Sequence, residues 1–392
     1  MLKCKRLWQA KRLAGSAWSR SLHAAKAEAG DLWVWGLNDD AAECAPAHVQ
    51  VGKVKSVSCG LFHWAAISEE GKLFTCGRAD AGRLGRSLED VKMTPAFRSY
   101  AQEAGEVDLH GFAAAVVAAG GLHSLVVLQG GELLAFGFGA WGQLGLGHIR
   151  GMENLDNAMT PKWVKGVKEV REASAGGAHS AAIDGDGRLY TWGRNETGRL
   201  GYVSDAFIQN VPKEVEVEGG ERFKLVTASA YQTFAVSSKD ELWSWGSGSN
   251  GELGLGEKKT VFTPNRVVAL AGERVTAVAA GAFHAAAATA NGDILVWGAG
   301  ADGQLGLGEG VTSALEPTRV SGLPRMRTVA CGSMHTVAVS EDGEVFCWGA
   351  QRGGQSEKGD TEVYREPHAM TALPGRVRTV SAGGTRSAAI LE

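Results

Sequence analysis

Residues 281–308 read GAFHAAAATANGDILVWGAGADGQLGLG, and versions of this pattern occur seven times along the chain. A typical copy has a His three positions after a Gly, then an alternating run, a polar turn and a second run that ends in Trp-Gly. The His position is filled in turn by His63, His123, His179, Gln232, His284, His335 and Arg386. Successive copies are spaced by roughly fifty to sixty residues, which is the period of a propeller blade or a solenoid unit.

The local chemistry of the repeat favours a propeller over a solenoid. HAAAATA and DILVWG have the length and near-alternation of strands, and the turn between them contains Asn, Gly and Asp, as in a hairpin. A Pro-x-x-Val marker follows about twenty residues after most Trp-Gly pairs and suits the start of an edge strand. With the Val-rich run before each His, these elements make four strands per unit. The sequence therefore predicts an all-β fold, a seven-bladed β-propeller of four-stranded blades.

The two ends of the repeat region are complementary. Residues 31–36 (DLWVWG) match the run that ends in Trp-Gly, but the Val-rich run that leads to the repeat His is missing before them. Residues 376–391 (RVRTVSAGGTRSAAIL) contain that missing portion and then stop. We expect the two segments to form one composite blade, so that pairing of N- and C-terminal strands closes the ring and removes the exposed sheet edges. On this interpretation residues 31–392 form one propeller domain.

Residues 1–27 differ in composition from the rest of the chain. They contain seven Lys or Arg and no acid, and Glu28 is the first acidic residue. A basic amphipathic segment without acids is typical of an organellar transit peptide. We interpret residues 1–27 as a targeting extension for the mitochondrial matrix, with a plastid as the alternative; a nucleic-acid-binding arm or a nuclear signal is the competing interpretation. No run in the sequence approaches the length of a membrane-spanning helix, so no membrane span is predicted.

The copies GGAHSAAIDGDGRLYTWGRNETGRLG (residues 176–201) and GSMHTVAVSEDGEVFCWG (residues 332–349) resemble the repeats of the regulator of chromosome condensation family. The resemblance covers about residues 31–392 and implies the propeller fold. It implies less about function, because the family includes exchange factors for the small GTPase Ran, photoreceptors, ubiquitin-ligase modules and organellar assembly proteins. A fold shared by such different proteins does not determine which activity this chain has.

The charge of the propeller argues against general nucleic-acid binding. The chain has 40 Lys and Arg against 43 Asp and Glu, and seven of the basic residues lie in residues 1–27, which leaves a formal balance of −10 elsewhere. An acidic body offers no general attraction to phosphate backbones. Two basic pairs, Arg325 with Arg327 and Arg376 with Arg378, occupy the same place in successive repeats. We interpret them as solvated loop charge.

The repeats contain no recognisable catalytic, cofactor-binding or metal-binding set. Matches to Gly-x-Gly-x-x-Gly, such as residues 298–303, are followed by Gln-Leu-Gly-Leu-Gly without helical periodicity, so they are interpreted as turns and not as dinucleotide sites. The repeated His residues would lie far apart around a ring, and each is expected to join neighbouring strands by a hydrogen bond. The six Cys show no Cys-x-x-Cys spacing and are interpreted as small hydrophobic residues. We therefore predict a non-enzymatic protein without cofactors.

Departures from the repeat mark the candidate partner-binding residues. Trp141 lies on a polar loop where other copies have Ala, Thr, Asn or Asp, and we interpret it as an exposed anchor. Trp64 replaces Ser, Thr or Ala, and packing is its favoured interpretation, with partner contact as the alternative. Two apparent insertions, residues 98–111 and 148–160, suggest a binding face or ordinary loop drift, and the first could form a short helix. They add the candidates Arg98, Tyr100, His148, Arg150, Glu153 and Asp156.

Two functions of the family fit this sequence poorly. The Ran exchange factor, as the resemblance implies, inserts a wedge after one of its Trp-Gly strands, whereas here four residues separate each such strand from the next Gly-Gln-Leu-Gly slot. The photoreceptors need clustered Trp and Arg after the repeat Gly, where this chain has GLFH, GGLH, GGAH, SAYQ, GAFH, GSMH and GGTR. Three hypotheses remain: a non-catalytic protein-interaction scaffold or assembly factor in an organelle, an exchange factor for a small or organellar GTPase, and an RNA- or ribosome-associated assembly factor. The acidic body favours the first.

Overall fold

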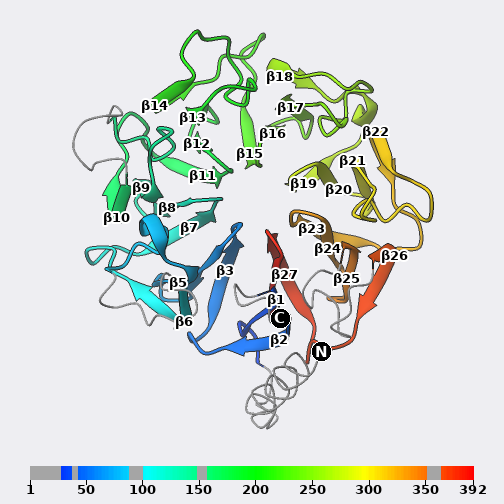
Figure 1. The fold of residues 1–392 in the computed structure, drawn as a ribbon, viewed down its shortest axis with the longest axis horizontal. Coiled ribbons are helices and arrows are strands. Elements are labelled where there is room, and N and C mark those ends of the chain that lie inside the picture. The colour runs from blue at the N-terminus through cyan, green and yellow to red at the C-terminus, as the bar shows by residue number, and fades with distance from the viewer. Residues whose placement is uncertain (1–27, 38–42, 88–99, 148–156, 351–362) are drawn as a thin grey trace, which may run out of the picture.

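The computed structural model describes residues 28–37, 43–87, 100–147, 157–350 and 363–392. These residues form seven four-stranded antiparallel sheets, which stand as blades around a central axis (Figure 1). The predicted all-β, seven-bladed propeller is thereby confirmed. Within the described ranges, helix is limited to two short 3-10 turns, Asp80–Gly82 and Val268–Leu270.

The blades follow one another along the chain, and we number them from the first complete one. Blade 1 consists of β3 (Val54–Cys59), β4 (His63–Ser68), β5 (Leu73–Arg78) and β6 (Tyr100–Val107), and blade 2 of β7 (Ala114–Ala119), β8 (His123–Leu128), β9 (Leu133–Phe138) and β10 (Asn157–Trp163). Blade 3 consists of β11 (Val170–Ala175), β12 (His179–Asp184), β13 (Leu189–Arg194) and β14 (Ile208–Glu214), and blade 4 of β15 (Phe223–Ala228), β16 (Gln232–Ser237), β17 (Leu242–Gly246) and β18 (Val261–Arg266).

The remaining three blades complete the ring, and in every blade the first strand is the innermost. Blade 5 consists of β19 (Val275–Ala280), β20 (His284–Thr289), β21 (Ile294–Ala299) and β22 (Ser313–Arg319), and blade 6 of β23 (Met326–Cys331), β24 (His335–Ser340), β25 (Val345–Ala350) and β26 (Val363–Met370). Blade 7 consists of β27 (Val377–Gly383), β28 (Arg386–Leu391), β1 (Leu32–Leu37) and β2 (Glu43–Val49).

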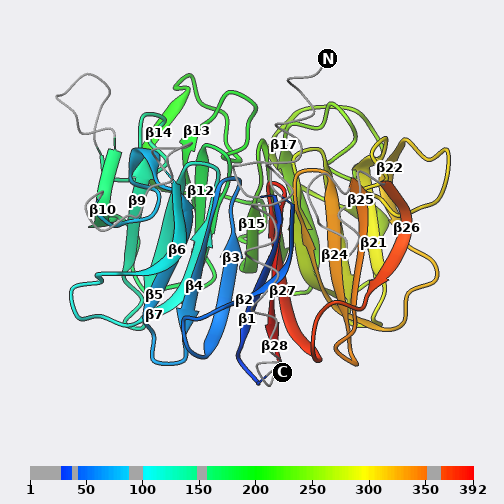
Figure 2. The ribbon, with the colours of Figure 1, turned by 60° about the horizontal axis from the view of Figure 1, so that its bottom comes forward.

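Blade 7 is built from both ends of the described chain. β1 pairs antiparallel with β28, so that Leu32 lies opposite Ile390 and Trp35 lies opposite Ser387. The sheet order is β2-β1-β28-β27, with the C-terminal pair inside and the N-terminal pair outside. β1 and β28 lie side by side in Figure 2. The predicted closure by pairing of terminal strands is confirmed.

The core consists of the interfaces between blades, and the second strands occupy its centre. All six residues of each second strand are buried. A strand covered on both faces by closely packed neighbours has room for small side chains, and β20 accordingly reads HAAAAT. The third strands contribute Trp side chains that are almost completely buried: Trp35, Trp192, Trp245, Trp297 and Trp348.

The proline markers that the structure describes lie inside the outer strands, whereas the sequence had suggested that they begin these strands. Pro264 falls in β18 between Val261 and Asn265, where the register with β17 shifts. Pro161 falls in β10 at the equivalent shift in register with β9. A bulge on an edge strand tolerates a residue that lacks an N–H. The marker therefore identifies the edge strand correctly and misplaces its beginning.

One expected insertion is a regular strand. Residues 98–111 were expected to form an inserted loop or a short helix, but Tyr100–Val107 form β6, the outer strand of blade 1. Ala101 and Val107 are buried, whereas Glu103 is exposed. An outer strand packs on its own blade and also meets water, so a polar composition does not exclude it. The prediction of a loop or helix for this segment is wrong for that reason.

Candidate functional site on the upper face

The two faces of the propeller are built from different connections. Loops between the first and second strands of each blade, and between the third and fourth, form the upper face at the top of Figure 2. Hairpin turns between the second and third strands form the lower face, together with the connections between blades and the C-terminus. Trp141, on the loop between β9 and β10, belongs to the upper face.

The repeated His residues join neighbouring blades. His63 Nε2 lies 2.7 Å from Ser124 Oγ of the next blade. The same bond, at 2.8–2.9 Å, joins His123 to Ser180, His179 to Thr233, His284 to Thr336 and His335 to Ser387. Ser124 Oγ donates onward to the carbonyl oxygen of Arg83 at 3.1 Å, so it accepts its other hydrogen bond from the Nε2–H of His63. The hydrogen-bonding role expected for these residues is confirmed.

Burial keeps these imidazoles neutral. It lowers the pKa of His123 and His284 to about 3 and that of His335 to about 4. For His63 and His179, burial also lowers the pKa well below 6.5, and nearby arginines add to the effect. The Gly that precedes each His belongs to the same packing, because a Cβ at Gly176 would lie 2.4 Å from the Ser229 carbonyl oxygen. The repeated Gly and His are thus used for blade packing and not for a ligand.

One blade junction uses a different polar pair. Between blades 4 and 5, Gln232 replaces the His, and Ala285 replaces the hydroxyl residue. Gln232 Nε2 donates to Glu252 Oε1 at 3.1 Å, and both side chains are buried. The His and its hydroxyl partner are therefore exchanged together, since a His opposite Ala285 would leave a buried N–H without an acceptor.

Trp64 is a core residue at the junction that closes the ring. Its side chain is only 5% exposed and packs with Cys59 and Cys76. Arg386 of blade 7 occupies the opposite His position, and its Nη2 donates to Tyr100 Oη at 3.2 Å. Burial of Trp64 supports the packing interpretation and argues against its use as a partner contact. The candidate Tyr100 is half-buried and takes part in the same junction.

Replacing Trp64 with Ala is expected to lower the free energy of unfolding by about 3–5 kcal/mol, because the substitution leaves a cavity between blades 7 and 1. Urea denaturation followed by circular dichroism measures the change. Trp141→Ala is the matched control on a surface loop, and it should change stability much less. If both variants unfold at the urea concentration of the wild type, Trp64 does not have the packing role described.

Trp141 is held against the next blade. Arg194 of blade 3 lies over its ring, with the guanidinium carbon 4.3 Å from the ring centroid. The main-chain N–H of Trp141 donates to Gln143 Oε1 at 3.0 Å. The indole is half-buried, so part of it remains at the surface of the upper face. The other candidates, Arg98, His148, Arg150, Glu153 and Asp156, lie outside the described residues.

Large apolar side chains recur on the upper face, next in sequence to loop residues that line the central channel. The position before the His holds Phe62, Leu122, Tyr231, Phe283 and Met334 in five blades, and we call these residues the apolar collar. Tyr231 is 44% exposed and Phe283 is 38% exposed. Arginines stack on two members, with Arg78 5.2 Å from the Phe62 centroid and Arg199 5.0 Å from that of Tyr231. Sequence reasoning missed the collar, although large residues recur at this position in the copies.

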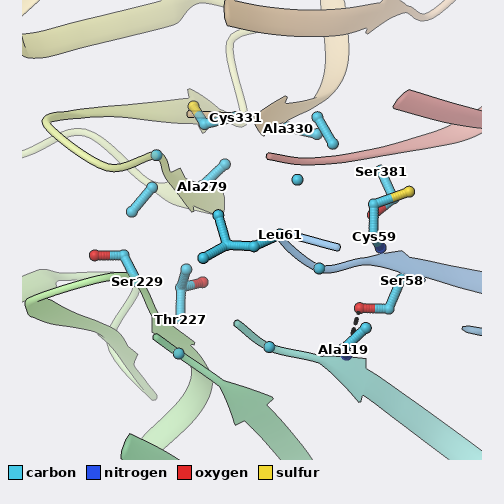
Figure 3. A pocket seen from close by; sticks show the side chains of 18 of the residues that line it. Ser58, Cys59, Leu61, Ala119, Thr227, Ser229, Ala279, Ala330, Cys331 and Ser381 are labelled. Carbon is cyan, nitrogen blue, oxygen red and sulfur yellow. Dashed lines mark hydrogen bonds between the residues drawn. The ribbon is translucent and has the colours of Figure 1, made fainter. Parts of the chain in front are cut away.

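The channel inside the collar is neutral. Its volume is about 310 Å³, and small residues of all seven first strands line it. Ser58 Oγ accepts a hydrogen bond from the Ala119 N–H of the next blade at 2.9 Å, so its hydroxyl is already used between blades. Leu61 extends its side chain into the space between the strands (Figure 3). Apart from the thiols of Cys59 and Cys331, no ionisable side chain lines this part of the described structure.

The described residues offer little for catalysis or metal binding. They contain no group of three or more His, Cys, Asp or Glu side chains able to hold a metal ion. Burial raises the pKa of the Cys59, Cys76 and Cys331 thiols to about 12, which makes them poor nucleophiles. Burial also raises the pKa of Glu172 to about 7, but no metal-binding group accompanies this carboxyl. Among the described helices, none has the length and apolar character needed to span a bilayer.

The two basic pairs lie on the lower face and are engaged within the protein. Arg325 forms an ion pair at 3.2 Å with a glutamate, Glu341, in the hairpin turn of its own blade. Arg327 and Arg376 both contact Glu392, at 2.8 and 2.9 Å. Arg378 Nη2 donates to main-chain carbonyls of blade 1. These four residues therefore do not form an unpaired basic patch.

A family model described as the RCC1-like domain matches residues 39–389. This chain belongs to the RCC1-like domain family. Human E3 ubiquitin-protein ligase HERC2 is 34% identical to this RCC1-like chain over 330 residues, which are 83% of the chain and 7% of HERC2. The chain thus corresponds to a small part of HERC2, whose activity as a whole protein is not transferred to it.

In two further comparisons, the matched region covers a larger share of the related protein. The Arabidopsis thaliana RCC1 domain-containing protein RUG3, mitochondrial, is 30% identical over 347 residues, or 84% of this chain and 75% of RUG3. The crystal structure of Prp20p from Saccharomyces cerevisiae has a TM-score of 0.79 at 19% identity, covering 93% of this chain and 92% of Prp20p. Prp20p has binding properties toward Gsp1p and histones. Structural likeness at that identity shows the RCC1-like fold alone.

Proposed function

We propose that this RCC1-like propeller is a non-catalytic protein-interaction scaffold or assembly factor that binds its partner through the upper face. The observation that carries the proposal is the apolar collar, in which Tyr231 and Phe283 are exposed and Arg199 stacks on the Tyr231 ring. Aromatic and Arg side chains are enriched at protein interfaces. The repeated His and Trp residues are meanwhile used for packing between blades, so the collar and the neighbouring loops are left for partner contact.

Affinity capture from a mitochondrial extract tests this proposal. The bait is the full chain, and the matched variant carries Tyr231→Ala and Phe283→Ala, which remove two exposed rings without opening the core. Val268→Ala, at an exposed lower-face residue, is the control. Proteins enriched by the wild type and the control should be depleted at least tenfold with the double variant, provided that its melting temperature is unchanged. Equal recovery with all three baits would exclude the collar as the binding site.

We also propose a mitochondrial matrix location, with a plastid as the alternative. The composition of residues 1–27 and the likeness to RUG3, mitochondrial, support it. Residues 1–27 fused to a fluorescent protein are expected to direct the fusion to mitochondria. In the matched control, the seven Lys and Arg of this segment become Gln, which removes the charge that import requires. A diffuse or nuclear signal from the unmodified fusion would refute the targeting proposal.

A guanine-nucleotide exchange factor is the second candidate, favoured by the structural likeness to Prp20p, which binds Gsp1p. Against it stand the four-residue spacings after the Trp-Gly strands, which leave no room for an inserted wedge in the copies that have them. We expect purified protein not to accelerate the release of fluorescent GDP from small mitochondrial GTPases. Robust acceleration in this assay would replace the scaffold proposal with the exchange proposal.

A further inference from the structure

A second departure from the repeat lies at the lower face of the propeller, away from the apolar collar on the upper face. Trp163 ends β10, the outer strand of blade 2, and points outward with 43% of its surface exposed. The same position in the other blades holds His48, Glu106, Glu214, Arg266, Arg319 and Ala369. These residues are polar or small, as suits the end of an edge strand in water. The packing of a blade therefore does not require a large ring at this position.

A second exposed ring lies against Trp163. Phe112, in the connection from β6 to β7, is 50% exposed, and its ring meets that of Trp163 edge to face, with centroids 5.5 Å apart and an interplanar angle of 90°. Edge-to-face contact is a favoured aromatic geometry. The pair comes from separate elements of the chain, so each ring limits the motion of the other. It forms a preorganised apolar platform at the lower outer edge of blade 2.

Three lysines lie beside or shortly after Trp163 in the chain, and none of them has a partner among the described residues. Lys162, Lys165 and Lys168 are exposed, whereas the residues spaced between them, Val164 and Val167, are buried in the core. This spacing directs all three lysines to solvent. Throughout the described residues, no ion pair or hydrogen bond is formed by any of the three ammonium groups. The basic pairs of blades 6 and 7, by contrast, are engaged with Glu392 and with main-chain carbonyls.

We propose that Phe112, Lys162, Trp163, Lys165 and Lys168 form a binding patch for single-stranded nucleic acid. Unstacked bases pack on exposed aromatic rings, and lysines beside the rings neutralise the phosphates that follow the same strand. Duplex nucleic acid does not fit, because its bases are already stacked on one another. The net acidity of the propeller limits binding to this patch and excludes general attraction along its surface.

The composition of the patch distinguishes this ligand from two other classes. Protein interfaces are enriched in Arg and depleted in Lys, whereas every cation of the patch is Lys. Membrane attachment requires a broad apolar surface in addition to charge, and here two rings provide the apolar area. The patch is also separate from the upper face, so it can be tested independently of the proposed protein partner.

Fluorescence anisotropy of a labelled RNA 12-mer of mixed sequence, titrated with the full chain in low salt, tests the proposal. Saturable binding is expected, and Trp163→Ala should weaken it about tenfold or more, the loss of one stacked base. If each patch lysine neutralises one phosphate, changing Lys162, Lys165 and Lys168 to Gln should make the slope of log K against log salt less steep by about 2. Residues 1–27 are present in every protein, so differences between variants report the patch.

Matched controls make the test specific. Phe207→Ala removes an exposed ring from the upper face, and Gln at Lys239, Lys258 and Lys259 removes the same charge elsewhere. Neither change should alter RNA binding. The proposal is overturned if the RNA does not bind, if the controls weaken binding as much as the patch variants, or if a duplex of the same sequence binds equally well. Binding to phosphatidylserine vesicles or to an acidic peptide that is lost with Trp163→Ala, without RNA binding, would assign the patch to a membrane or a protein instead.

Discussion

Deleting residues 376–392 is expected to abolish the stable propeller, leaving a chain that aggregates or melts far below the wild type. The deletion removes β27 and β28, the two inner strands of blade 7, and leaves β1 and β2 as a hairpin without a sheet. A two-stranded hairpin is marginally stable in water. The cut also exposes the adjoining faces of blades 1 and 6, including His335, which loses its hydrogen bond to Ser387. Removal of the first seventeen residues of the chain should have a much smaller effect.

Differential scanning calorimetry and sedimentation of the truncated chain provide the measurement. Removal of Glu392 alone is the control, because it deletes the exposed ion pairs to Arg327 and Arg376 but no strand. Such surface pairs contribute on the order of 0–1 kcal/mol, so the control should melt close to the wild type. A monomeric truncated chain with the wild-type melting temperature would show that the terminal strands do not close the ring.

Acid is expected to destabilise the propeller strongly between about pH 6.5 and pH 5.5. The five buried imidazoles have pKa values lowered by burial, to about 3 or 4 where a value is resolved, so in the fold they stay neutral in this range. In the unfolded chain they protonate as the pH falls through about 6.5. The unfolded state then binds more protons, and stability falls with pH. Between pH 6.5 and pH 5.5, each His lowers the free energy of unfolding by about 1 kcal/mol, and the five together lower it by about 5 kcal/mol. The whole free energy of unfolding of a typical protein is roughly 5–15 kcal/mol.

Chemical denaturation at pH 7.5, 6.5 and 5.5 measures this loss. His179→Gln is the informative variant, since Gln232 already occupies the equivalent position at another junction. The variant is expected to be less stable than the wild type at pH 7.5. Its free energy of unfolding should fall by about one fifth less on acidification, because four of the five buried imidazoles remain. Stability that does not change between pH 7.5 and 5.5 would mean that the imidazoles are not held neutral by burial.

The features that recur in most blades could be predicted from the sequence. The His, the preceding Gly and the Trp-Gly strand are required by contacts between blades, such as His179 Nε2 with Thr233 Oγ1 at 2.8 Å. Because the same contact is repeated, the same residue types return at a fixed spacing. Closure of the ring was predictable for a related reason: residues 31–36 lack the inner strands that residues 376–391 contain.

The features that do not recur were harder to predict. β6 is polar because it is an outer strand, and its composition resembled a loop when taken without its partner strand. Packing was the favoured interpretation of Trp64, but the sequence did not show that it packs at the junction where Arg386, also an exception to the repeat, takes the His position. The platform of Trp163 and Phe112 depends on a contact between separate elements, which spacing alone does not show. Trp163 could have been found by comparing the residues two places after each Pro of the outer strands.

The most direct test of upper-face binding is the dissociation constant of a captured partner for the wild type and three variants. Trp141→Ala and the double variant Tyr231→Ala with Phe283→Ala should each lose about 2 kcal/mol or more of binding free energy, which is typical of central anchors, at unchanged melting temperatures. Val268→Ala on the lower face should bind as the wild type does. Wild-type affinity in both upper-face variants, with loss of affinity in Val268→Ala, would contradict upper-face binding and place the partner on the lower face.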